Sequence, residues 1–156
     1  MNKHVVRRAA AGDAAPILEL RERSILALCV GDYTEEQIDA WMGKRLAKGY
    51  QEWIENSPFF VSTLGGKVTG YAAYNPKSQE LLAAYVDPDY VRQGAATSLV
   101  EAIFSDARGR GLESLWLDAS LTAVPFYEAA GFKPVKETTH SFSGVPLECL
   151  RMETDL

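Results

Sequence analysis

The sequence predicts a single-domain fold of the α/β or α+β class. Its 156 residues are the size of one domain, and 47% hydrophobic with 24% charged residues is typical of a globular protein. Segments with helical spacing alternate with segments rich in β-forming residues, and no repeat, low-complexity tract or linker divides them. We therefore expect residues 1–156 to form one domain.

The first part of the chain is expected to be mainly helical. Residues 4–8 predict a short first strand, and Asp13 is placed to cap a helix over residues 14–29. Thr34-Glu35-Glu36-Gln37 has the form of a capping box, which starts a second helix. A third helix is expected over residues 44–54.

The middle of the chain changes to a strand pattern. Residues 59–64 and 67–74 are rich in β-formers and are separated by Gly65-Gly66, which predicts a hairpin with a tight primed turn. Residues 80–86 predict a third strand. An antiparallel meander is therefore expected.

The second half begins with a helical pattern that follows Pro88 and ends at the Arg108-Gly109-Arg110-Gly111 stretch. A strand is expected over residues 114–118. Because a helix separates it from the strand over residues 80–86, the two strands are predicted to be parallel. The remaining expected elements are a short helix over residues 122–130 and two strands over residues 132–140 and 145–153.

Composition excludes several classes of function. The net charge is −5 and no Lys/Arg run is present, so a nucleic-acid partner is not expected. No apolar run approaches the ~20 residues that span a bilayer, and the N-terminus lacks the apolar core of a signal peptide, which favours a cytoplasmic protein without a membrane partner. Cys29 and Cys149 lie far apart, and the histidines are His4 and His140, so neither a disulfide framework nor a metal site is predicted.

One candidate site lies where the meander joins the following helix, from Val86 to Thr97. Free backbone N–H groups at a helix start, together with the helix dipole, form an anion site. Gly94 and Ala96 leave room for phosphate oxygens, and Arg92 can add a charge-assisted contact. The nucleotide patterns GxxxxGK[ST] and GxGxxG are absent. By itself the segment indicates an anion site or simply a glycine that starts a helix.

A second motif follows at Phe126-Tyr127-x-x-x-Gly131-Phe132. Together with Val86-Asp87-Pro88 and Gly94-x-Ala96, in this order after a meander, it resembles the GNAT superfamily of N-acetyltransferases. Close matching covers residues 80–132, and the expected element order fits the family over the whole chain. The resemblance implies a mixed, mainly antiparallel sheet with helices on both faces and acetyl-CoA as the acetyl donor.

The resemblance also implies where the donor binds. In the family the strand that carries Val86 splays away from the strand that carries Asp118, the pantetheine arm lies in the cleft, and the pyrophosphate lies on the amides from Arg92 to Thr97. A backbone N–H near Val86 polarises the acetyl carbonyl. The cofactor-binding residues implied are Tyr85, Val86, Arg92, Gln93, Gly94, Ala95, Ala96, Thr97, Ser120 and Phe126.

Two residues are implied in catalysis. Tyr127 is placed to protonate the departing CoA thiolate or to hydrogen-bond to it, although a buried core tyrosine is the alternative. Glu80 stands at the distance from Gly94 at which histone-acetyltransferase-like members place a catalytic glutamate. A solvated glutamate after a turn is the alternative for Glu80, and many family members use water-relayed deprotonation of the amine instead.

Two positions depart from the family pattern. Val91 stands where the family has Arg or Gln, with Arg92 and Gln93 following it, and the backbone amides would still serve. Ser120 stands where many members have an asparagine, and a serine there can cap the helix that follows. Ser120 with Asp118 and His140 also suggests a hydrolase triad, but no GxSxG elbow is present, so we discount that interpretation.

The acceptor side is indicated only loosely. His140 lies near the turn between the last two strands, which borders the acceptor pocket in the family, and is a candidate for binding substrate or for acting as a base. Asp32 and Tyr33 are candidates for the opposite wall, and Trp41 is expected in the core. A Cys29–His140 nucleophilic pair has no support in the sequence.

The function predicted from the sequence is transfer of acetyl from acetyl-CoA to a primary amine of a small molecule or protein, by direct attack. The alternatives are a non-catalytic acyl-CoA-binding regulatory domain and an acyltransferase for longer chains. The sequence does not identify the acceptor, because acceptor specificity resides in variable loops. It also leaves open whether the protein forms a homodimer.

Overall fold

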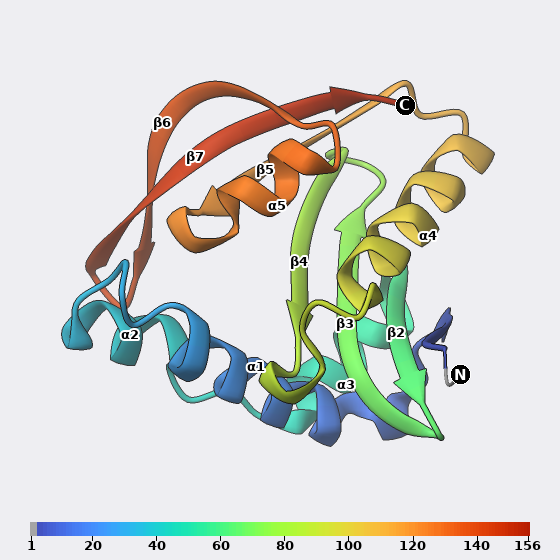
Figure 1. The fold of residues 1–156 in the computed structure, drawn as a ribbon, viewed down its shortest axis with the longest axis horizontal. Coiled ribbons are helices and arrows are strands. Elements are labelled where there is room, and N and C mark those ends of the chain that lie inside the picture. The colour runs from blue at the N-terminus through green and yellow to red at the C-terminus, as the bar shows by residue number, and fades with distance from the viewer. Residues whose placement is uncertain (1–2) are drawn as a thin grey trace.

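The structure, a computed structural model, describes residues 3–156 and contains one mixed sheet with helices on both faces (Figure 1). The strands are β1 (Val5–Arg8), β2 (Phe59–Leu64), β3 (Lys67–Asn75), β4 (Glu80–Val86), β5 (Ser114–Ser120), β6 (Lys133–Phe142) and β7 (Val145–Asp155). The α-helices are α1 (Ala14–Leu28), α2 (Glu35–Met42), α3 (Ala47–Asn56), α4 (Ala95–Gly109) and α5 (Val124–Ala129). Single 3-10 turns lie at Ala11–Asp13, Pro88–Tyr90 and Leu121–Ala123. The predicted fold class is therefore confirmed.

The strands lie in the order β1-β2-β3-β4-β5-β7-β6. Strands β2, β3 and β4 form the predicted antiparallel meander, and β4 pairs with β5 in parallel, as the intervening helix predicted. The β4–β5 pairing is short, since its register contains the single pair Glu80 and Trp116. Beyond this pair the two strands diverge, and the sheet opens between them (Figure 1).

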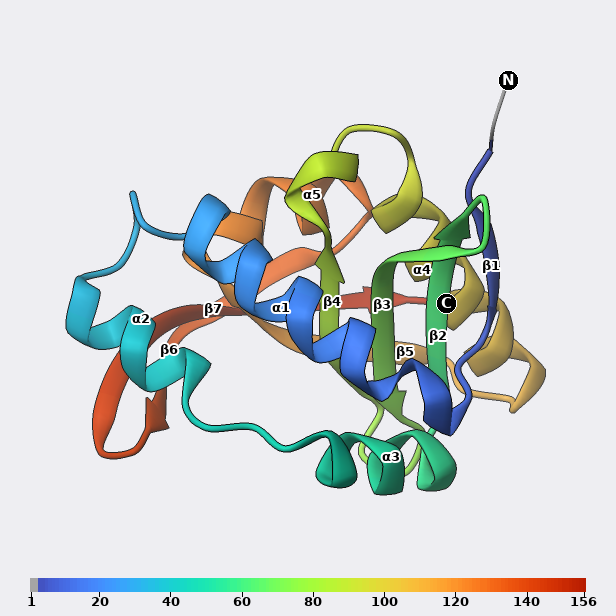
Figure 2. The same ribbon diagram turned by 90° about the horizontal axis from the view of Figure 1, so that it is seen from below.

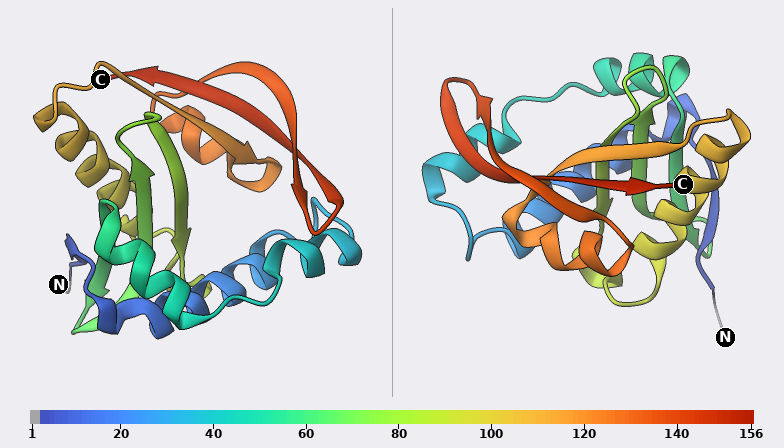
Figure 3. Two further views of the ribbon diagram at one scale, coloured as in Figure 1. Left: turned by 180° about the vertical axis from the view of Figure 1, so that it is seen from behind. Right: turned by 90° about the horizontal axis from the view of Figure 1, so that it is seen from above.

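The two faces of the sheet carry different helices. Helix α4 packs on β2, β3 and β4, and the core on this face includes Tyr127 of α5. Helix α1 packs on β3 and β4 from the opposite face, with α3 beside it, as the view from below shows (Figure 2). Helix α2 lies at the end of the β6–β7 hairpin, which the view from behind shows clearly (Figure 3). Helices therefore lie on both sides of the opening between β4 and β5.

Local signals account for several element boundaries. The capping box is present, because the Thr34 hydroxyl accepts the Gln37 N–H at 3.2 Å and the Gln37 side chain accepts the Thr34 N–H at 2.9 Å. Gly65 and Gly66 have φ of +58° and +83°, which a primed two-residue turn requires.

Some boundary details were predicted wrongly. The Asp13 carboxylate accepts the Ala10 N–H and pairs with Arg7, so it caps the 3-10 turn before α1 and makes no cap bond to α1 itself. By contrast, the helix expected to open at Gly94 does so: α4 starts at Ala95, after a 3-10 turn and Gly94 with φ of +86°. Helix α3 starts three residues later than expected, and both C-terminal strands extend two residues further.

Candidate active site

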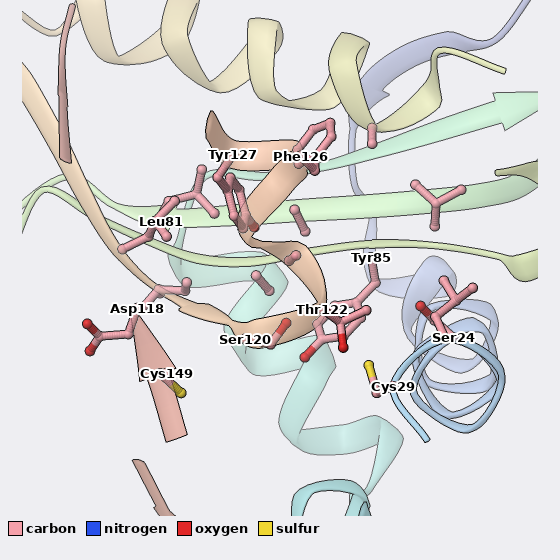
Figure 4. A pocket seen from close by; sticks show the side chains of 18 of the residues that line it. Ser24, Cys29, Leu81, Tyr85, Asp118, Ser120, Thr122, Phe126, Tyr127 and Cys149 are labelled. Carbon is pink, nitrogen blue, oxygen red and sulfur yellow. The ribbon is translucent and has the colours of Figure 1, made fainter. Parts of the chain in front are cut away.

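A pocket of about 450 Å³ occupies the opening between β4 and β5 (Figure 4). At its closed end the Trp116 N–H donates to the Gln79 carbonyl at 3.0 Å, and residues 80–86 of β4 line one wall. Leu117, Asp118 and Ser120 of β5 contribute to the other wall. The splayed strands that the family resemblance implied are therefore present.

The pocket passes through the sheet from one face to the other. Along β5, Leu117 and Ala119 belong to the core beneath α4 and α5. Because side chains alternate along a strand, Asp118 and Ser120 face the side of α1. We call the two parts the α4 half and the α1 half. The α4 half is lined by Val86, Arg92, Gly94, Ala95, Ala96, Thr97, Phe126 and Tyr127, and the α1 half by Ser24, Cys29, Tyr33, Trp41, Tyr85, Asp118, Ser120, His140, Phe142 and Leu147.

The α4 half ends at the N-terminus of α4. Gly94 is the N-cap residue in a left-handed conformation, and the Ser98 N–H is the first to bond within the helix, to the Gly94 carbonyl at 3.0 Å. The N–H groups of residues 95–97 therefore precede the helical hydrogen bonds and remain available as donors. A Cβ atom added at Gly94 would meet nothing within 4 Å, so open space adjoins these donors.

The loop before α4 is held from two sides. Arg23 of α1 donates to Asp87 at 2.7 Å and to Asp89 at 2.8 Å. The Gln93 side chain is turned to His4 on the N-terminal segment, with 3.3 Å between its Oε1 and the His4 Nε2, and it does not line the pocket. Gln93 was predicted to bind the cofactor, but its side chain is turned away, so it can reach the pocket through its backbone alone.

Tyr127 lies over the α4 half with its side chain buried, at 6% exposure. Its ring packs edge-on against Phe126 and Phe132, with centroid distances of 5.3 and 5.6 Å. No side chain or backbone group of residues 3–156 makes a hydrogen bond with its hydroxyl. Burial raises the pKa of Tyr127 well above its ordinary value, so the hydroxyl remains a proton donor at neutral pH.

Glu80 stands at the closed end of the pocket and is half-buried. Within the described residues its carboxylate forms no ion pair. Burial raises the pKa of Glu80, and the nearby negative charge of Asp118 raises it further. A carboxylate with a raised pKa is a stronger base than an ordinary glutamate.

Asp118 is the centre of a charged cluster. Its side chain is 4% exposed, and it accepts two hydrogen bonds from Arg151, at 2.8 and 2.9 Å, and one contact from the His140 Nε2 at 2.8 Å. The Arg151 hydrogen bond is the main cause of the lowered pKa of Asp118. His140 is 43% exposed and stands at the pocket mouth. The sequence suggested His140 and Asp118 as neighbours, but Arg151 carried no signal there.

Ser120 does not act as the predicted cap. It occupies the N-cap position of the 3-10 turn after β5, yet its side chain accepts no cap hydrogen bond, because the hydroxyl faces the pocket (Figure 4). No hydrogen bond links Ser120 with His140 among the described residues, so a Ser-His-Asp chain is not assembled.

Tyr33 and Asp32 differ in their relation to the pocket. Tyr33 is buried and lines it, whereas Asp32 does not line it and instead accepts a hydrogen bond from the Thr122 hydroxyl at 2.6 Å. Trp41 is part of the core, as expected, and also lines the pocket. Ser24, Phe142 and Leu147 also line the pocket and carried no signal in the sequence, because each comes from a different element and none belongs to a motif.

The described residues contain neither a membrane-spanning helix nor a metal-binding cluster. Between residues 3 and 156 no helix is long and apolar enough to cross a membrane. In the same range no three or more His, Cys, Asp or Glu side chains are grouped so that they could hold a metal ion.

The sheet is open between two parallel strands, and a helix N-terminus lies at one end of the opening. This is the arrangement of an acetyltransferase fold, and comparisons with known proteins agree with that class. Residues 29–155 match the family described as Acetyltransferase (GNAT) domain. The chain therefore belongs to the GNAT family of acetyltransferases.

Named relatives are N-acetyltransferases, and this chain is an enzyme of that class. It is 27% identical to the uncharacterized N-acetyltransferase YafP of Escherichia coli K12 over 137 residues, covering 88% of this chain and 86% of the relative. It is 33% identical over 97 residues to the [ribosomal protein bS18]-alanine N-acetyltransferase of the same strain, covering 59% of this chain and 64% of the relative.

Solved structures agree with the fold over the full length. A GCN5-related N-acetyltransferase from Rhodopseudomonas palustris superposes with a TM-score of 0.93 at 29% identity, covering 100% of this chain and 98% of that one. The PaiA N-acetyltransferase of Thermoplasma acidophilum, in complex with coenzyme A, superposes with a TM-score of 0.83 at 18% identity and covers 99% of each chain. The second likeness supports the fold alone.

Proposed function

We propose that this enzyme moves the acetyl group of acetyl-CoA to a primary amine by direct attack, without a covalent enzyme intermediate. The observation that carries the proposal is the continuous pocket between β4 and β5, which has anion donors and a phenol in one half and carboxylates in the other. Solved structural neighbours that contain coenzyme A or acetyl-CoA support the choice of donor.

The α4 half suits the donor. The N–H groups from Arg92 to Thr97 would bind the pyrophosphate, and the helix dipole would favour its negative charge. Beyond Glu80, the edge of β4 that faces β5 has no strand partner, so the backbone at Tyr85 and Val86 can pair with pantetheine amides as an added strand would. Phe126 lines the same half, and Ser120 lines the adjoining α1 half.

The chemistry requires one proton to leave the amine and one to reach the thiolate. The amine nitrogen would attack the acetyl carbon, a backbone N–H near Val86 would stabilise the oxyanion, and the carbon–sulfur bond would then break. Tyr127 would protonate the CoA thiolate, because its hydroxyl is protonated and lines the pocket. Glu80 would take the amine proton, directly or through a water molecule.

A specific observation makes His140 the second candidate for the base. Its Nε2 contacts Asp118, which is itself fixed by Arg151, and the ring stands at the pocket mouth. A carboxylate that orients an imidazole is a common arrangement for a general base. Glu80 is preferred because its carboxylate has no ion-pair partner among the described residues and so remains available to the amine.

A thiol-release assay with acetyl-CoA and a panel of primary amines tests the proposal. Release of CoA that depends on an amine, with an acetylated product in the mass spectrum, supports it. Calorimetric binding of acetyl-CoA without release by any amine would instead support the non-catalytic acyl-CoA-binding domain. Butyryl-CoA in a parallel series measures the preference for acyl-chain length.

A further inference from the structure

One side of the α1 half of the pocket is closed by contacts between segments far apart in sequence. The Tyr33 hydroxyl donates to the Glu148 carbonyl at 2.6 Å and accepts the Leu121 N–H at 2.9 Å. The Gln37 side chain donates to the Pro146 carbonyl at 3.0 Å. These bonds fasten the α1–α2 connection to the β6–β7 hairpin, which lie side by side in the figures (Figures 1 and 3).

Burial strengthens this closure. Tyr33 is 7% exposed, and burial raises its pKa to about 12, so its hydroxyl stays protonated and keeps its donor bond at neutral pH. An apolar cluster packs beneath the hydrogen bonds. Its buried members are Ile25, Cys29, Tyr33, Ile38, Trp41 and Leu147. A protein terminus or an extended peptide would have to separate this cluster before it could lie across the pocket.

The charges of the lining restrict the acceptor further. The carboxylates that line the pocket are those of Glu80 and Asp118, and the Asp118 charge is already compensated by Arg151. Glu80 is then the one lining carboxylate without an ion-pair partner among the described residues, and it matches one ammonium group of the acceptor. A polyamine would bury additional ammonium groups without partners, which is costly.

Lys and Arg side chains are also missing where the carboxylate of an amino-acid acceptor would need one. Arg92 is the lining residue with a guanidinium, and it belongs to the α4 half. Arg21 lies close by, 5.9 Å from the Tyr85 ring, but it does not line the pocket and donates to the carbonyls of Trp41 and Met42. The carboxylate of an α-amino acid would therefore meet no Lys or Arg side chain in the α1 half, where the His140 Nε2 is already engaged by Asp118.

We propose that the acceptor is a compact monoamine with an apolar body of about aromatic size and no carboxylate. This inference rests on the proposed acetyl transfer. The ammonium group enters beside Glu80, and the body packs against Trp41, Tyr85 and Phe142, whose rings offer apolar faces. The body then excludes water from the amine before it attacks the thioester.

Phenethylamine and L-phenylalanine form a matched pair of probes, because they differ in the carboxylate alone. Spermidine and a hexapeptide with an N-terminal alanine complete the set. We expect kcat/KM for phenethylamine to exceed that for each of the others by about 100-fold or more, since the others bury unpaired charge or do not fit.

A variant should weaken the discrimination between phenethylamine and phenylalanine. Phe142→Arg places a guanidinium at the pocket wall and is expected to raise kcat/KM for phenylalanine relative to phenethylamine by about tenfold. Val135→Arg on the same strand is the control, because Val135 is 48% exposed and does not line the pocket, and it should leave the ratio unchanged.

The outcomes separate the two proposals. Equal or faster acetylation of phenylalanine, spermidine or the peptide by the unmodified enzyme would overturn the acceptor class while acetyl transfer stands. If acetyl-CoA binds and none of the four amines nor the wider panel releases CoA, the proposed transfer fails and the acceptor class fails with it.

Discussion

The two halves of the pocket are built in opposite ways. The α4 half comes from two continuous stretches of chain, residues 86–97 and 126–127, and offers mainly backbone N–H groups and one phenol. The α1 half collects side chains from α1, α2, β4, β5, β6 and β7, and these contacts join residues more than 100 positions apart. A part made from local backbone can be inferred from a motif, whereas a part made from distant side chains cannot.

The two halves also differ in what holds them. Ion pairs from Arg23 to Asp87 and Asp89 fix the loop of the α4 half. The α1 half depends on hydrogen bonds from buried side chains to backbone carbonyls and on the Asp118 cluster. Substitutions in the α4 half should therefore change donor binding or thiolate departure, and substitutions in the α1 half should change amine chemistry or stability.

The largest effect is expected from Tyr127→Phe in the α4 half. Loss of the proton donor should lower kcat by about 10²–10³-fold, in the range of general acid catalysis, with the dissociation constant of acetyl-CoA nearly unchanged. Stopped-flow thiol release and calorimetry measure the two quantities. Tyr50→Phe is the control, because Tyr50 is buried outside the pocket. Unchanged kcat in the Tyr127 variant would make this residue a core tyrosine.

Glu80→Gln tests the base in the α1 half. Glu80 must be ionised to accept a proton, so kcat/KM of the unmodified enzyme should fall as pH drops through the raised pKa of Glu80. We expect the variant to lose about 100-fold in kcat/KM near neutral pH and to lose this acid limb. The pH profile of His140→Gln is the comparison. If that variant loses the limb and Glu80→Gln keeps it, His140 is the base.

Asp118→Asn tests how much the charge of Asp118 stabilises the α1 half. The substitution weakens hydrogen bonds between charged partners, and we expect a loss of about 1.5–3 kcal/mol in the free energy of unfolding at neutral pH. The pKa of Asp118 is lowered in the folded protein, so its contribution is present above the unfolded pKa of about 3.9 and is lost as pH falls through the folded value.

Urea denaturation at several pH values measures this effect. The difference between the variant and the unmodified protein should shrink on acidification. A difference that stays constant with pH would show that the Asp118 charge adds nothing to stability.

The smallest effect is expected from Gly94→Ala. The left-handed φ of +86° costs an alanine about 1–2 kcal/mol, so the loop should relax and the dissociation constant of acetyl-CoA should rise about tenfold. Gly109→Ala is matched to it, because Gly109 lies in the same helix without a positive φ and with open space around it. Calorimetry should show unchanged affinity in that control. Equal affinity in both variants would mean that the α4 N-terminus is not the anion site.

Features that depend on interactions between neighbouring residues were predicted correctly from the sequence, and features that depend on distant residues were not. The capping box at Thr34, the Gly65-Gly66 turn and the bounds of β4 were all predicted correctly, because each depends on neighbouring residues. The expected cap by Ser120 was wrong, since a hydroxyl beside an open pocket need not bond to the next turn. The side-chain direction of Gln93 depends on His4, which is distant in sequence and gave no signal.

The amino-acid sequence by itself determined the order of elements, the parallel pairing of β4 with β5 and the place of the free N–H groups at the start of α4. Period, turn residues and contiguous motifs encode these features locally. The tertiary structure alone decided the depth of the opening between β4 and β5, the Asp118–Arg151–His140 cluster and the closure of the α1 half by Tyr33 and Gln37. Strand divergence and packing between distant segments produce these features, so no local pattern could indicate them.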